Sequence, residues 1–245
     1  MSIPDFFSSL YDRHGINLSI FYDAYDREVF LAGLWHTGVL SVISIATSIV
    51  LGALGAAIQF SKSRPGNAIV ALYVQVFRNT PPLIQLYFFY FALGPLLTQL
   101  AGLQTPILTN VTWAIVSLSL YAAAFNVEIF RAGIEAVPAS TLEAASALGL
   151  SRSQQFRRIV LPLAARISLP AMTNNLVNLI KTTTNAFAIA VPELLYASSQ
   201  IWSEQSNTLE MMVVLLLFYC VTIGAFVGIA HALERRMAVP GWGKA

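Results

Sequence analysis

The stretch EAASALGLSRSQQFRRIVLPLA, residues 143–164, decides how the chain is interpreted, because it is polar and basic yet lies between long apolar runs. The whole chain has 245 residues, of which 56% are hydrophobic and 11% are charged, and its mean hydropathy is +0.67. A soluble domain typically has about 25% charged residues. We therefore expect a membrane protein in which residues 143–164 form a water-facing element between membrane-spanning segments.

Five segments are long and apolar enough to cross a membrane, because a span needs about 20 mainly apolar residues. They lie at residues 30–60, 67–93, 108–129, 167–190 and 209–233, and the fourth is the weakest. The first is rich in small residues, among them Gly33, Gly38, Gly52 and Gly55, which allow helices to approach closely in lipid. The expected fold is therefore an all-α membrane protein with five transmembrane helices.

The distribution of lysine and arginine sets the expected orientation, because cytoplasmic connections carry an excess of both. The connections after the first and third spans and the segment after the fifth are basic, whereas residues 94–107 have no charge. Residues 1–29 lack the pattern of a cleavable signal peptide. We expect 1–29 to be an extracytoplasmic tail and 236–245 to be a cytoplasmic tail, with residues 138–162 also facing the cytoplasm.

Several classes of function are disfavoured by composition. The net charge of +2 is too small to indicate a nucleic-acid partner, and the single cysteine, Cys220, offers no disulfide or metal framework. The sequence contains no Walker loop and no pairing of a nucleophile with a base. We expect no cofactor in this chain and no catalytic residue.

Residues 138–150 are expected to form a short helix with a glycine corner. Pro138 suits the first turn of a helix, and Ser140 or Thr141 can cap its free amides. Gly149 is expected to end the helix in a left-handed conformation.

A second helix is expected to follow over residues 152–161, capped by Ser151 and ended by Pro162. Together the two helices form an elbow with an apolar knob and a basic surround. The knob consists of Ala144, Ala145, Leu148 and Leu150. From chemistry alone, this elbow is also compatible with a connector that lies on the membrane surface with its arginines on lipid headgroups.

The elbow resembles a known signature. Glu143-Ala144-Ala145 is followed after three residues by Gly149 and, after nine more, by the segment Ile159–Pro162. This pattern is similar to the EAA loop of ABC importer permeases, which forms a coupling helix in a groove of the cytoplasmic ATPase. The resemblance implies that the ATPase-coupling residues are Glu143, Ala144, Ala145, Leu148, Gly149 and Leu150.

Three further segments resemble permeases for polar amino-acid uptake. They are YVQVFRNTPPLIQLYFFYFAL (73–93), EIFRAGIEAVPASTLEAASALGL (128–150) and NLIKTTTNAFAIAVPELL (178–195). The likeness covers roughly residues 30–240 and departs at Asn79, where glycine is usual, and at Thr182, where many members have aspartate. It implies a permease domain over 30–235 in a bacterial inner membrane. The implied partners are a second permease, identical or homologous, two ATPase subunits and a solute-binding protein.

Two basic residues, Arg78 and Lys181, fall inside predicted spans, where ionisable groups are costly and usually functional. Both lie beside helix-disturbing sequences, and broken helices at mid-membrane depth are where transporters build substrate sites. The predicted substrate site comprises Arg78, Thr80, Gln85, Lys181, Thr182, Thr183 and Thr184. Arg78 is also compatible with a structural pairing, and Lys181 with a packing or snorkelling role.

Other polar residues have structural interpretations. Asn174, Asn175 and Asn178 are expected to bond neighbouring helices, and Glu128 is expected to pair with Arg131.

The sequence thus predicts a permease subunit of an ATP-driven importer for polar amino acids. Because Thr182 is neutral beside two cations, acidic or neutral substrates are expected to be favoured over basic ones. The alternatives are a stand-alone secondary transporter or channel, which would not need the elbow, and a membrane sensor or scaffold, which would bind without transport.

Overall fold

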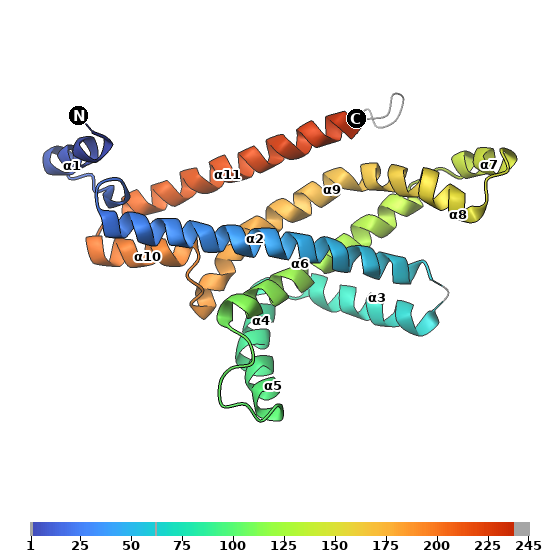
Figure 1. The fold of residues 1–245 in the computed structure, drawn as a ribbon, viewed down its shortest axis with the longest axis horizontal. Helices are drawn as coiled ribbons and strands as arrows, with labels where there is room; N and C mark the ends of the chain where they lie inside the picture. The colour runs from blue at the N-terminus through green and yellow to red at the C-terminus, as the bar shows by residue number, and fades with distance from the viewer. Residues whose placement is uncertain (1, 62, 238–245) are drawn as a thin grey trace. The chain divides into compact units, whose positions relative to one another are not determined.

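The computed structural model describes residues 2–61 and 63–237, and this part of the chain is built from helices without strands. Figure 1 shows the long helices, of which α2 and α11 are unbroken along their length. The elements are α1 (Ile3–His14), η1 (Ser19–Phe21), α2 (Ala24–Gln59), α3 (Arg64–Asn79), α4 (Pro82–Tyr87), η2 (Phe88–Leu93), α5 (Gly94–Leu100), α6 (Asn110–Glu135), α7 (Ala139–Ala147), α8 (Arg152–Gln155), η3 (Phe156–Val160), α9 (Leu161–Thr182), η4 (Thr183–Ile189), α10 (Leu194–Gln205) and α11 (Thr208–Met237).

Four of the described helical stretches are long and apolar enough to cross a membrane, at residues 24–59, 82–100, 110–135 and 208–236. Three of them correspond to the first, third and fifth predicted spans. The fourth predicted span is helical as α9 and continues into the 3₁₀ turns of η4, but it does not reach the same apolarity. The prediction of an all-α membrane fold is confirmed, whereas the number of five spans stays a prediction.

The second predicted span, 67–93, is wrong as a single helix. The helix α3 ends at Asn79, and Thr80 is extended at φ −114° and ψ 143°. A proline disfavours the helical conformation in the residue before it, and Pro81 imposes this restriction on Thr80. A new helix starts at Pro82 and runs through η2, which is π-helical, to Leu100. The stretch that is long and apolar enough to cross a membrane is therefore 82–100.

The chain divides into two compact units, each assembled from separate segments. The first consists of the described residues within 1–44, 82–118 and 180–224, and the second of those within 45–81, 119–179 and 225–245. In the first unit, Leu40, Leu86, Ala114 and Val191 belong to one buried apolar cluster.

Close packing in the first unit depends on a glycine of α2. A Cβ atom built on Gly33 would lie 2.5 Å from the Cβ of Ala197 in α10. The fully buried Glu193 caps α10, since its carboxylate accepts the amides of Leu195 and Tyr196 at 2.9 Å each. The Leu194 amide donates to the hydroxyl of Thr37 at 3.0 Å. Helix α10 is thus fixed to α2 by close approach and by a side-chain bond.

The second unit contains a helix crossing that is both close and polar. Cβ atoms built on Gly52 and Gly55 of α2 would lie 2.4 Å from Asn126 Cβ and 2.5 Å from Val127 Cγ2 in α6. The expected close approach through small residues is confirmed here and at Gly33, whereas Gly38 has nothing within 4 Å. At this crossing the Asn126 amide donates to the Ser48 hydroxyl at 3.2 Å.

Helix α9 joins this crossing through asparagine. The amide of Asn175 donates to the Oδ1 of Asn126 at 2.9 Å and to the carbonyl of Ala122 at 3.0 Å. Asn178 donates to the Tyr121 hydroxyl at 3.5 Å. The prediction that asparagines of this segment bond neighbouring helices is therefore confirmed for Asn175 and Asn178, whereas Asn174 is exposed.

Candidate functional site

The elbow between α6 and α9 has the two-helix form that its sequence predicts. Helix α7 starts after Pro138, which is its extended N-cap residue, and the predicted side-chain cap from Ser140 or Thr141 is wrong. Gly149 takes φ +75°, a left-handed conformation that glycine adopts without a steric penalty. The amide of Leu150 donates to the carbonyl of Ala145 at 3.1 Å, which closes the end of α7.

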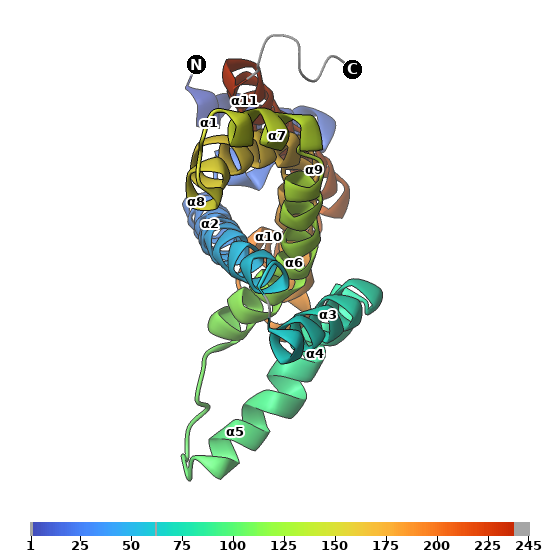
Figure 2. The same ribbon diagram turned by 90° about the vertical axis from the view of Figure 1, so that its right-hand side faces the viewer.

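The second arm of the elbow starts at Ser151, as predicted. Its hydroxyl accepts the Gln154 amide, and the Gln154 side chain accepts the Ser151 amide, so a full capping box is present. The side-chain amide of Gln155 donates to the Leu150 carbonyl at 2.8 Å and to the Ser146 hydroxyl at 3.0 Å. These bonds brace α7 against α8, and both views show the two arms joined by a short turn (Figures 1 and 2).

The predicted break at Pro162 is wrong. Helices α8, η3 and α9 follow one another without a gap from Arg152 to Thr182. The stretch η3 is π-helical, with the Leu161 amide bonded to the Phe156 carbonyl. Pro162 lies in the first turn of α9, directly after this wider turn, so the chain passes the proline without ending the helix. The elbow is therefore fixed directly to the end of a long helix.

The exposed surface of the elbow differs from the predicted knob at one residue. Glu143, Ala144, Leu148 and Gly149 are exposed, and Leu148 has 81% of its surface accessible. Ala145 is buried, and Leu150 is half-buried, so the prediction that Ala145 belongs to a projecting knob is wrong. A large exposed leucine at a rigid glycine corner, beside an exposed carboxylate, forms a compact protrusion that a partner surface can receive.

Arg78 belongs to a row of alternating charges on α3 and α6. Its guanidinium lies 3.8 Å from the carboxylate of Glu128 and 5.3 Å from the ring centroid of Phe125. Glu128 also pairs with Arg131 at 2.9 Å, and Arg131 pairs with Glu135 at 2.7 Å. The predicted Glu128–Arg131 pair is confirmed. The structural alternative for Arg78 is also supported, because a carboxylate already offsets its charge.

Hydroxyls of the predicted substrate site are mostly bonded to backbone. Thr80 donates to the Val76 carbonyl, Thr183 to that of Ile180, and Thr184 to that of Lys181, each at 2.8 Å. Thr183 is fully buried, Thr182 is half-buried, and Lys181 is exposed. Gln85 is buried in the first unit. Arg78 and Thr80 belong to the second unit, whereas Gln85 and residues 181–184 belong to the first, and their union into one substrate site stays a prediction.

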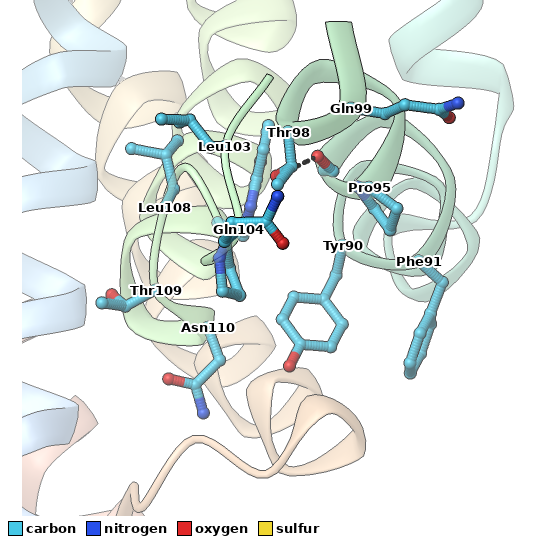
Figure 3. A pocket seen from close by; sticks show the side chains of 13 residues that line it. Tyr90, Phe91, Pro95, Thr98, Gln99, Leu103, Gln104, Leu108, Thr109 and Asn110 are labelled. Carbon is cyan, nitrogen blue, oxygen red and sulfur yellow. Dashed lines mark hydrogen bonds between the residues drawn. The ribbon is translucent and has the colours of Figure 1, made fainter. Parts of the chain in front are cut away.

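A hollow of about 820 Å³ that the sequence did not indicate lies in the first unit, between α5, the connection after it and the start of α6. Figure 3 shows Tyr90, Gln104 and Asn110 around this space. The Asn110 amide also donates to the carbonyl of Ala190 at 2.8 Å. None of the residues that line the hollow belongs to the predicted substrate set, and none is charged. Part of its polar lining, Gln104 and Thr109, comes from the connection between α5 and α6, which has no periodic pattern, so the sequence does not predict the hollow.

Comparison with known proteins places the chain in a family. The family described as "Binding-protein-dependent transport system inner membrane component" matches residues 48–239. The probable glutamine ABC transporter permease protein GlnM of Bacillus subtilis is 32% identical over 91% of this chain and 98% of its own length. The arginine transport system permease protein ArtQ of the same organism is 33% identical over 84% of this chain and 91% of its own.

Solved structures show the same fold. A crystal structure of an amino acid ABC transporter with histidines has a TM-score of 0.76 and 26% identity, covering 86% of this chain and 94% of the other. A structure of the MetNI methionine ABC transporter has a TM-score of 0.69 over 89% of this chain and 100% of the other. At 19% identity, this second likeness concerns the fold alone.

The fold and the elbow define a permease, the membrane-spanning class of ABC importer subunits. This chain belongs to the family of inner membrane components of binding-protein-dependent transport systems. It is a multi-pass inner membrane protein. Permease subunits of this family are not enzymes, because nucleotide binding and hydrolysis are carried by a separate ATPase subunit.

Proposed function

We propose that this chain is a permease subunit of an ATP-driven importer that carries polar amino acids across the bacterial inner membrane. The elbow is the observation that carries the proposal, because it exposes Glu143, Ala144 and Leu148 around a left-handed Gly149. The names of the glutamine and arginine permeases add the substrate class. In this proposal the elbow fits into an ATPase subunit, two of which assemble with two permeases and a solute-binding protein.

The proposed topology has five spans, with the N-terminus outside and the C-terminus in the cytoplasm. Residues 64–100 together provide one crossing, because Arg64 follows the first span and the basic elbow follows the third. Helix α9 is less apolar than the other spans, but its Asn175 is bonded to α6. A polar group that is satisfied by a neighbouring helix is tolerated within a membrane.

Cysteine labelling tests this topology in a background that carries Cys220→Ala. Cysteines at Gln99 and Gln200, both exposed, are expected to react with an impermeant thiol reagent added outside intact cells. Cysteines at the exposed Ser63 and Ser151 are expected to react only after the membrane is opened. The reverse labelling pattern would place the elbow outside the cell and remove the basis for its contact with an ATPase.

Charge around Lys181 supports a preference for acidic or neutral amino acids. The side chain is exposed, and the next residue, Thr182, is neutral. Arg78 contributes less than the sequence indicates, because Glu128 lies 3.8 Å away. A cationic substrate group about 6 Å from Lys181 would be repelled by about 3 kcal/mol at an effective dielectric of about 20. Relatives named for glutamine and for arginine both occur, so the preference rests on charge alone.

The decisive experiment measures uptake of a labelled amino-acid panel by the complete transporter in liposomes, with ATP inside and the binding protein outside. We expect ATP-dependent uptake in which glutamate and glutamine exceed arginine and lysine, and Thr182→Asp should raise the relative uptake of the basic pair. Equal or greater uptake of basic amino acids by the unmodified transporter would refute the charge argument alone. Uptake by the purified chain without an ATPase would instead support a secondary transporter or channel.

A further inference from the structure

An apolar groove of about 510 Å³ opens within the second unit, between α2, α6 and the run from η3 into α9. Small side chains on two of its walls, Ala53, Ala57 and Ala165, leave the space, and all three are exposed. Phe60, Phe130 and Phe156 also line it. A volume of this size falls in the range of ligand-binding pockets, about 300–1,000 Å³. The groove therefore suits an apolar chain rather than a polar solute.

Two basic residues lie in the chain between residues that line this groove. Arg157 and Arg158 directly follow Phe156 and precede Leu161, and both Phe156 and Leu161 line the groove. Both are exposed. Among the residues that the structure describes, no carboxylate oxygen lies within 4.0 Å of either guanidinium. They differ in this respect from Arg78 and Arg131, whose charges are paired.

We propose that this groove binds an anionic phospholipid of the cytoplasmic leaflet. One acyl chain lies along the alanine and phenylalanine walls, and the headgroup phosphate lies on Arg157 and Arg158. Charge complementarity supports this occupant, since basic residues beside a span on the cytoplasmic side attract anionic lipid. A planar guanidinium also matches the geometry of a phosphate. In this proposal the bound lipid contacts the continuous helix formed by α8, η3 and α9, whose first part is the second arm of the elbow.

Native mass spectrometry of the complete detergent-purified transporter tests the headgroup contact. The probes are phosphatidylglycerol and phosphatidylcholine with identical acyl chains, added at equal concentration. We expect phosphatidylglycerol adducts to survive at collision energies that remove phosphatidylcholine. The double variant R157Q/R158Q should weaken phosphatidylglycerol retention by about tenfold or more, since each base near an anionic headgroup contributes about fivefold. The matched control, R235Q/R236Q, removes two exposed arginines at the end of α11 and should retain the lipid.

Filling the groove tests the acyl-chain contact separately. Ala165→Phe and Ala57→Phe each place a ring in the groove from a different helix, whereas Ala225→Phe adds the same ring to an exposed position of α11. The first two should lose phosphatidylglycerol and the third should keep it, with all three complexes assembling at wild-type yield. Equal retention of the two lipids would overturn the proposal. Retention unchanged in both filled variants, or in R157Q/R158Q, would also overturn it.

A further test compares phosphatidylglycerol binding to the isolated permease with binding to the complete transporter. If phosphatidylglycerol binds the isolated permease but not the complete transporter, a protein subunit covers the groove and the proposal fails. That result would leave the role as a permease intact, because uptake by the complete transporter is measured independently.

Discussion

The elbow and the crossing of α2, α6 and α9 both depend on glycine and on polar side chains, but they use them in opposite ways. At the elbow, Gly149 has open space around it and is needed for its φ of +75°. At the crossing, Gly52 is needed because a Cβ would lie 2.4 Å from Asn126. Polar groups at the elbow bond to partners at most nine residues away in the chain, whereas Asn126 and Asn175 are 49 residues apart. The elbow is thus a locally determined shape, and the crossing is a tertiary one.

The largest expected effect is at the crossing. Gly52→Leu forces α2 away from α6, because the added side chain meets the backbone and Cβ of Asn126 rather than a flexible tip. Overpacking of this kind costs about 3 kcal/mol or more, so we expect little assembled transporter. The matched variant is Gly38→Leu, at an exposed α2 glycine with nothing within 4 Å. Yield of the purified complex is the measurement, and equal yields would show that the crossing is not tight.

A smaller loss is expected from the asparagine that joins α9 to this crossing. Asn175→Leu removes donors to Asn126 and to the Ala122 carbonyl and leaves their oxygens buried. Interhelical bonds in membranes contribute about 0.6 kcal/mol on average and up to about 1.7 kcal/mol. Thermal unfolding of the purified complex should shift down by a few degrees, whereas Asn174→Leu at the exposed neighbour should not shift it. A lower midpoint only for Asn174→Leu would contradict the assignment of Asn175 to the crossing.

The smallest effect is expected at the elbow cap. Ser151→Ala removes the hydroxyl that accepts the Gln154 amide, and loss of such a cap costs about 1 kcal/mol. Amide hydrogen exchange over residues 152–156 should then accelerate about fivefold, with the crossing unaffected. Ser153→Ala, an exposed position inside α8, is the control. Faster exchange throughout α9 would show that the elbow is not a separate local unit.

This comparison explains which features could be predicted from the sequence. Gly149 and Ser151 were predicted correctly, because the conformation of a turn and its cap is decided within a few residues. The sequence does not distinguish Gly38 from Gly52, since both are glycines of α2. They differ because Asn126 of α6 lies against Gly52, whereas nothing lies within 4 Å of a Cβ built on Gly38. The small residues therefore predicted close approach but not where it occurs.

Errors arose where neighbouring geometry outweighed a local signal. Pro162 predicts the end of a helix, but the π-helical turn before it lets the helix continue. At Pro81 and Pro82 the reverse holds, because the apolar run predicts one span although the backbone is extended at Thr80. The pairing of Arg78 with Glu128 requires α3 and α6 to meet, which no periodicity in either segment reveals. The hollow beside Gln104 likewise depends on how an irregular connection folds.

The measurement that tests the central claim most directly compares Gly149→Asp with Gly102→Asp in the complete transporter in liposomes. Both glycines are left-handed, at φ +75° and +67°, and both have open space, so each change carries a similar local cost of about 1–2 kcal/mol. If the elbow transmits ATP hydrolysis, Gly149→Asp should lower uptake and binding-protein-stimulated ATPase activity about tenfold or more, in the range of couplings between sites. Gly102→Asp should leave both near wild type. Full uptake and full stimulation in an assembled Gly149→Asp transporter would show that the elbow is only a connector.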